Sequence, residues 1–157
     1  MSSDWGASPT GEEAYFRNMG LSQARTRAVL QHALSLLEDD GLLLITVPAF
    51  RALWTSHDDL NHHQTRYTKR TFARLAEACG LEVLEARYFF HWTCPVKLLI
   101  RCKESLLASP PRPTRIPAAA VNRLCFLLSR SEQMILGRLP VPFGSSLLMV
   151  GRNRSPA

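Results

Sequence analysis

The feature that most constrains this chain is a short apolar run that stops at a proline. Residues Leu42–Val47 show no alternation of apolar and polar side chains, and Pro48 ends the run. This pattern is typical of a strand in a parallel sheet that is covered on both faces. Because ligand sites of open α/β sheets lie at the carboxyl ends of their strands, we expect functional side chains in the loop that follows.

That loop is dense with side chains that can transfer protons or bind charge. Its polar residues, all within eleven positions, are His57, Asp58, Asp59, His62, His63, Arg66 and Tyr67. A histidine beside a carboxylate can orient a substrate or accept a proton near neutral pH, so His57 and Asp58 are candidates for that role. The alternative is loop organisation, in which Asp58 caps backbone amides and His57 packs on Trp54.

The remaining loop residues also leave alternatives open. Adjacent histidines seldom face one ligand, so we expect one of His62 and His63 to point into the site, and a metal cluster is the less favoured interpretation. Arg66 is suited to binding a planar anion, or equally to an ion pair that holds the loop. Trp54 is favoured as a packing anchor over a stacking platform.

Helical and strand patterns alternate along the chain, which predicts an α/β fold with a partly parallel sheet. Residues 1–20 are expected to be a poorly ordered leader, because Gly6, Pro9 and Gly11 interrupt them. In the second strand, Leu84, Ala86, Tyr88 and Phe90 are expected to share one face. The expected helices are 22–38, 69–79, 95–107 and 118–137, the expected strands are 42–47, 82–90 and 145–150, and a proline-rich linker covers 110–117.

Charge divides the chain into an acidic and a basic part. Residues 1–85 hold eight Lys/Arg and eleven Asp/Glu, whereas residues 86–157 hold eleven and two. The basic part suits an anionic partner or a solvated surface, although nucleic acid ranks last because aromatic residues are not interleaved with the cations. Helix 118–137 is basic and amphipathic, so it is a candidate for a membrane surface, for a lid over an apolar substrate, or for an ordinary core helix.

The cysteines and the absence of targeting patterns bear on location. The four cysteines form no CxxC pair and lack the spacing of zinc ligands. No signal peptide and no apolar run of membrane-spanning length is recognisable. We therefore expect a cytoplasmic protein with reduced cysteines and no metal, with peripheral membrane attachment as an alternative.

Several motifs together resemble one family. A turn at Glu38–Gly41 leads into the strand and its proline, and Leu53-Trp54-Thr55-Ser56-His57-Asp58 follows. His63, then Arg66-Tyr67-Thr68, Ala78-Cys79-Gly80-Leu81 and the closing SSLLMVGR at 145–152 complete the pattern. From Ala28 to Val150 the chain resembles the C-terminal half of class I S-adenosylmethionine-dependent methyltransferases.

The resemblance implies a fold and a reaction. The fold is a partial Rossmann-like sheet made of the last three strands, with the final one antiparallel and with a helical insertion at about 95–139. The reaction is methyl transfer from S-adenosylmethionine to a small-molecule or lipid-like acceptor. Residues 54–67 would form the substrate side, with His57, Asp58 and His63 as catalytic residues and Trp54, Arg66 and Tyr67 as substrate-binding residues.

The cofactor side of such an enzyme has no counterpart in this sequence. The family holds its cofactor with a glycine-rich loop and an acidic residue after the first two strands, and no GxG occurs here. We therefore expect residues 21–157 to be the C-terminal portion of a methyltransferase domain, truncated or with a mis-called start. An open sheet edge would then make it marginally stable or self-associating. The non-enzymatic alternatives are a partner-binding remnant and a peripheral membrane protein.

Overall fold

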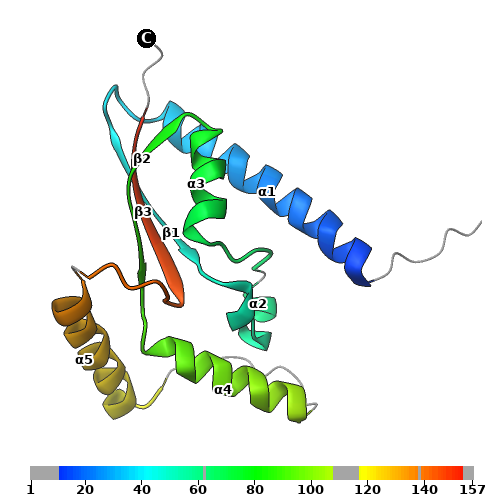
Figure 1. The fold of residues 1–157 in the computed structure, drawn as a ribbon, viewed down its shortest axis with the longest axis vertical. Helices are drawn as coiled ribbons and strands as arrows, with labels where there is room; N and C mark the ends of the chain where they lie inside the picture. Colours follow the sequence, from blue (N-terminus) through cyan, green and yellow to red (C-terminus); the bar gives the residue numbers. More distant parts are fainter. Residues whose placement is uncertain (1–10, 62, 108–116, 138, 154–157) are drawn as a thin grey trace, which may run out of the picture.

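The computed structural model describes residues 11–61, 63–107, 117–137 and 139–153, with the backbone alone for 11–22. Helices and strands alternate irregularly, and the α/β class is confirmed (Figure 1). The elements are α1 (Gly11–Ser35), β1 (Leu42–Pro48), η1 (Arg51–Leu53), α2 (Ser56–Leu60), α3 (Lys69–Glu77), β2 (Leu81–Phe89), α4 (Thr93–Leu106), α5 (Ala119–Leu136) and β3 (Ser146–Asn153).

The sheet has three strands in the order β1-β3-β2, and β3 is antiparallel to both neighbours. The last strand is thus antiparallel, as expected, but the expectation of a partly parallel sheet is wrong for the strands that the structure describes. The reason is topological: β1 and β2 run in the same direction, but β3 lies between them, so they never pair. The register places Ile45 and Ala86 opposite Met149 of β3.

One face of the sheet carries the hydrophobic core. Leu147 and Met149 of β3 are fully buried there beneath Phe72 of α3 and Leu30 of α1. Helices α1 and α3 both lie on this side of the sheet (Figure 1). Helix α3 begins as predicted, because the Thr68 hydroxyl accepts a hydrogen bond from the Thr71 amide and the Thr71 hydroxyl accepts one from the Thr68 amide.

The opposite face of β1 is open, contrary to the expectation that this strand is covered on both faces. Leu42 and Leu44 are 63% and 65% exposed, whereas Leu43, Ile45 and Val47 pack on the core. Strand β1 also pairs with a neighbour on one side only, so it is an edge strand among the described elements. The apolar sequence concealed this asymmetry, because leucine occupies both faces.

Strand β2 departs from simple alternation at a bulge. Val83 pairs with Gly151 and Glu85 with Val150, so Leu84 has no partner in β3. Val83, Ala86 and Tyr88 therefore face the core, and the expected inclusion of Leu84 in that face is wrong. Phe90 lies just beyond the strand, with a φ of +58°.

The helix boundaries differ from the predictions mainly at the N-terminus. Helix α1 begins at Gly11 rather than Ser22, so residues 11–20 are helical and not an irregular leader. Gly11, expected to interrupt this segment, is the first residue of the helix, and the internal Gly20 costs the helix only about 1 kcal/mol. Residues 1–10 and the linker prolines Pro110, Pro111 and Pro113 lie outside the described residues.

Helices α2, α4 and α5 lie beyond the end of the sheet where β1 and β2 finish (Figure 1). Helix α4 contacts η1 directly, and this places it beside the polar loop that follows β1. Within the described segments, no helix is long and apolar enough to cross a membrane.

We predict that two identical substitutions on the two faces of the sheet differ sharply in cost. Leu147→Ala opens a cavity in the core and is expected to lower the free energy of unfolding by about 2–5 kcal/mol. Leu44→Ala removes an exposed side chain and is expected to cost less than about 1 kcal/mol. Urea unfolding followed by circular dichroism measures both, and equal costs would contradict an open face on β1.

Candidate functional site

The polar loop after β1 is closed at its base by the backbone. Ala49 forms a parallel bridge with Tyr67, and the amide of Tyr67 donates to the Pro48 carbonyl at 2.9 Å. Phe50 donates to the Tyr67 carbonyl at 3.1 Å and has a φ of +52°, a left-handed conformation that is rare for a phenylalanine. The loop therefore begins and ends at the same place, the carboxyl end of β1.

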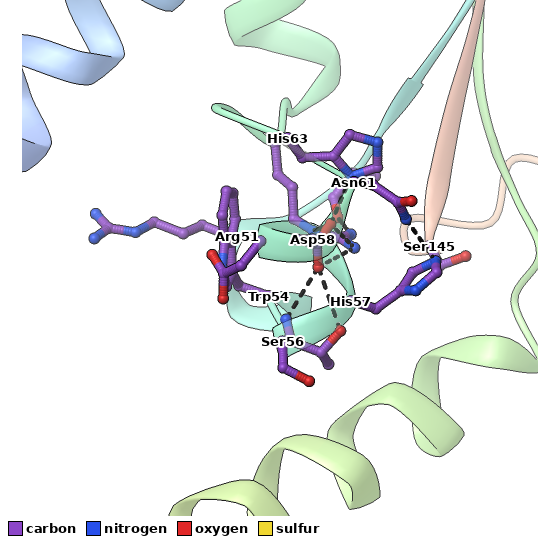
Figure 2. A network of polar contacts seen from close by, with 12 residues as sticks. Arg51, Trp54, Ser56, His57, Asp58, Asn61, His63 and Ser145 are labelled. Atoms are coloured by element: carbon purple, nitrogen blue, oxygen red, sulfur yellow. Dashed lines mark hydrogen bonds and ion pairs between the residues drawn. The ribbon is translucent and has the colours of Figure 1, made fainter. Parts of the chain in front are cut away.

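Asp58 lies at the centre of the loop and is completely buried (Figure 2). It occupies the third position of α2, where its Oδ2 accepts a hydrogen bond from the Thr55 amide at 3.0 Å. In return, the Asp58 amide donates to the Thr55 carbonyl at 2.9 Å. The carboxylate thus caps the N-terminus of α2, which is the organising role considered as the alternative for this residue.

Arg66 neutralises the buried carboxylate. Its Nη2 donates to both Asp58 oxygens at 2.8 and 2.9 Å, and its Nε donates to Oδ1 at 3.1 Å. Its Nη1 donates to the Ala49 carbonyl at 2.7 Å. Because the Arg66 side chain is only 1% exposed, the ion pair links the loop to the end of β1 and leaves this guanidinium little access to a substrate anion.

The surroundings of Asp58 keep it ionised at neutral pH. Burial by itself would raise the pKa of this carboxyl. Hydrogen bonds from Arg66, His63 and the Thr55 amide, together with the charge of Arg66, outweigh burial and leave the pKa below its ordinary value.

His63 is oriented by the same carboxylate. Its Nδ1 lies 2.9 Å from Asp58 Oδ1, and an ionised carboxylate can only accept a hydrogen bond. Nδ1 must therefore carry a proton, so the neutral ring keeps the lone pair on Nε2. The side chain is 39% exposed, which leaves a proton acceptor held in place at the loop surface.

His57 and Trp54 take other positions. The Nε2 of His57 lies 2.8 Å from the Asn61 side-chain amide, and the Nε1 of Trp54 donates to Asp59 at 3.0 Å. Figure 2 shows His57 and Trp54 on opposite sides of α2. The carboxylate of Asp58 is thus paired with His63 rather than with its neighbour His57, and His57 does not pack on Trp54.

Tyr67 lies in the core rather than at the loop surface. It is 5% exposed, its ring meets Phe72 edge-on at 5.0 Å, and its hydroxyl lies 3.1 Å from Thr26 Oγ1 of α1. This position favours a packing role over the substrate contact that the resemblance implies.

Helix α4 contributes residues to the site that the sequence did not indicate. Glu104 accepts from the Ser56 hydroxyl at 2.5 Å, and Arg101 donates to the Ala52 carbonyl at 2.6 Å. Burial, and then the nearby charge of Arg66, lowers the pKa of Lys97. The spacing of these three residues, four and then three positions, is a helical polar stripe that would have identified the inward face of α4.

No group of three or more histidines, cysteines or acidic residues able to hold a metal ion occurs within the described part of the chain. Asp58 is committed to Arg66, His63 and the Thr55 amide, and Asp59 to Trp54. His62, which the sequence offered as one ligand of a metal cluster, lies outside the described residues.

Comparisons with known proteins add no constraint. No family model matches this chain, no curated protein is similar to it, and no solved structure resembles it. The functional interpretation therefore depends on the geometry of the loop and on the motifs of the sequence.

We predict that Asp58→Asn destabilises the protein far more than Asp59→Asn does. The first change leaves the Arg66 charge buried without its counterion, which is expected to cost about 3 kcal/mol. The second retains an acceptor for Trp54 at an exposed position, and its expected cost is below about 0.5 kcal/mol. Chemical unfolding at pH 7 compares the two variants.

The same pair gives a pH dependence with a defined sign. Because the pKa of Asp58 is lower in the folded state than its ordinary value of 3.8, the carboxylate stabilises the fold fully only well above that pH. This contribution is lost as the pH falls through the lowered pKa. The difference in stability between wild type and Asp58→Asn should therefore shrink in acid, and a difference independent of pH would refute the assignment.

Proposed function

We propose that this chain provides the acceptor side of a class I S-adenosylmethionine-dependent methyltransferase, with His63 as the general base. The observation that carries the proposal is the Asp58–His63 pair at the carboxyl end of β1, in which Nε2 of His63 has no hydrogen-bond partner among the described residues. The sequence motifs at 53–68 support it. So does the antiparallel placement of the last strand, which agrees with the closing strand that the resemblance implies.

The described residues do not fit a cofactor site of the kind that the family uses. There is no glycine-rich turn after a strand, and the two acidic residues of the loop are bound by other side chains. We therefore assign no residue of this chain to S-adenosylmethionine, which in the proposed reaction supplies the methyl group.

The contribution of the chain is the handling of the acceptor's proton. A hydroxyl or amine that accepts a methyl group must also lose a proton. Nε2 of His63 takes that proton, and the resulting imidazolium is stabilised by the carboxylate of Asp58. Arg66 acts through Asp58 and is a positioning residue, and Trp54 and His57 border the loop where a small or lipid-like acceptor would bind.

A second candidate function is favoured by the open strand β1. Its outer edge has no partner among the described strands, and Leu42 and Leu44 are exposed on its uncovered face. A partner-binding protein without catalytic activity would use this edge to pair with another copy. We also propose a cytoplasmic location, in keeping with the four free cysteines.

We predict that His63→Gln strongly slows methyl transfer without unfolding the protein. The chain is incubated with methyl-labelled S-adenosylmethionine and with extracted small molecules and lipids, and transfer of the label to an extracted compound is followed. Removal of the base is expected to slow turnover about 10²–10⁴-fold. His32→Gln, a change to an exposed histidine of α1 outside the loop, is the matched control and should remain close to wild type.

Calorimetry with S-adenosylmethionine tests separately whether the chain binds this methyl donor. Micromolar binding by the purified chain and by both variants would support the enzyme. A flat titration with folded protein would exclude independent methyl transfer, and a concentration-dependent dimer that Leu44→Lys dissociates would then favour the partner-binding function.

A further inference from the structure

Helix α5 turns polar side chains toward the protein and exposes most of its apolar side chains, which is the reverse of an ordinary surface helix. The side chains that it turns toward the protein are Cys125, Ser129, Glu132 and Leu136, at helical spacing, and two of the four are polar. Its outward face is largely apolar, and the larger exposed side chains include Leu124, Phe126, Leu127, Met134 and Ile135, the last two 78% and 70% exposed. A helix that buries polar groups and exposes leucine and methionine requires a partner for its outward face.

The inward contacts of α5 hold this orientation. Glu132 lies with its Oε1 2.9 Å from Nδ1 of His91, and its Oε2 accepts from the Trp92 amide at 3.0 Å. Trp92 Nε1 donates to Ser129 Oγ at 3.1 Å. Burial opposes ionisation of Glu132, but the Trp92 and His91 amides and the adjacent His91 ring leave its pKa below the ordinary value. Rotation of α5 to bury its leucines would break all of these contacts.

Helix α4 repeats the arrangement. Its polar stripe of Lys97, Arg101 and Glu104 faces the loop, and Leu99 and Leu106, two turns apart, are 70% and 83% exposed on the other side. The two helices lie at the same end of the molecule (Figure 1).

The two helices also carry more positive than negative charge. Together they carry five Lys/Arg and two Glu, and both carboxylates are bound to other parts of the protein, Glu104 to Ser56 and Glu132 to His91 and Trp92. The charges left on the outward surfaces are cationic, from Lys103, Arg123 and Arg130, all of them exposed. A lipid bilayer with anionic headgroups offers both an apolar interior for the leucines and negative charge for the flanking cations.

We propose that α4 and α5 form a membrane-docking surface for an anionic lipid bilayer. Their exposed leucines would enter the interface between headgroups and acyl chains, while Lys103, Arg123 and Arg130 contact lipid phosphates. A second copy of this chain suits the surface less well, because it would bring the same cations together. RNA suits it less well, because the exposed apolar side chains of the two helices are mainly aliphatic and Phe126 is their one exposed aromatic ring.

The docking surface is linked to the candidate site. Helix α4 holds η1 through Arg101 and α2 through Glu104, so a bilayer bound to α4 would lie close to the loop that carries His63. The proposal does not depend on catalysis, and lipid binding can be measured whether or not the chain transfers methyl groups.

Vesicle sedimentation tests the surface. Vesicles of phosphatidylcholine with phosphatidylglycerol should bind the full chain, and phosphatidylcholine alone should bind it weakly. Raising the salt from about 0.1 M to about 1 M shortens the Debye length from about 10 Å to about 3 Å and should release most of the bound protein. The double variant Arg123→Glu/Arg130→Glu should weaken the partition at least about tenfold.

The control moves the same charge elsewhere. Arg70→Glu/Arg74→Glu changes two exposed arginines of α3 by the same net charge and should leave vesicle binding near wild type. Met134→Gln/Ile135→Gln should weaken binding while circular dichroism reports an unchanged fold. Equal binding to both vesicle types, or equal loss in the control, would overturn the proposal. So would a salt-sensitive shift of labelled RNA without vesicle binding, or a dimer that only Met134→Gln/Ile135→Gln dissociates.

Discussion

The buried ion pair of Asp58 and Arg66 is the interaction on which the loop after β1 depends. Both side chains are removed from water, and each would be strongly destabilising alone. Their burial is tolerable because both groups have further hydrogen bonds: Asp58 also accepts from the Thr55 amide and contacts the His63 ring, and Arg66 also donates to the Ala49 carbonyl. The pair therefore fixes where α2 begins, where the loop returns to β1, and which tautomer His63 adopts.

This arrangement assigns different tasks to residues of similar chemistry. Of the two described loop histidines, only His63 is held by the buried carboxylate, and His57 contacts Asn61 instead. Of the two loop aspartates, Asp58 organises the loop and Asp59 holds Trp54. A site with one oriented base on a rigid support is suited to proton removal from an acceptor, which is the step that we propose for it.

The helices beyond the sheet follow a related pattern, in which polar contacts point inward. Glu104 and Glu132 each hold a helix to the body of the protein, and the apolar side chains of those helices remain outside. In water such an arrangement exposes much apolar surface for little gain. At an anionic bilayer the same arrangement becomes complementary in both polarity and charge.

Local patterns in the sequence predicted much of this structure. The apolar run ending at Pro48 placed β1, and Thr68 placed the start of α3, because these signals act over a few residues. Features that depend on contacts between distant segments could not be predicted from these local patterns. The insertion of β3 between β1 and β2 is decided by packing across the whole sheet, and the open face of β1 is concealed by leucines on both faces.

The sequence indicated which loop carries the candidate site, but it did not indicate which histidine pairs with Asp58. Proximity in sequence favoured His57 as the partner of Asp58, whereas one helical turn and the return of the loop bring His63 there. Arg66 had two equal interpretations, and burial decides for the ion pair. Lys97 was missed because it belongs to a helix forty residues after the loop begins, although its stripe with Arg101 and Glu104 was visible in the sequence.

The protonation state of the His63 ring tests this account most directly. Nitrogen-15 NMR correlation of the ring nitrogens with the ring carbon-bound protons distinguishes the two neutral tautomers, and His63→Gln assigns the signal. At a pH where the ring is neutral, we expect a proton on Nδ1 and a bare Nε2. A proton on Nε2, or an equal mixture of the tautomers, would contradict an imidazole held by Asp58 and poised to accept a proton.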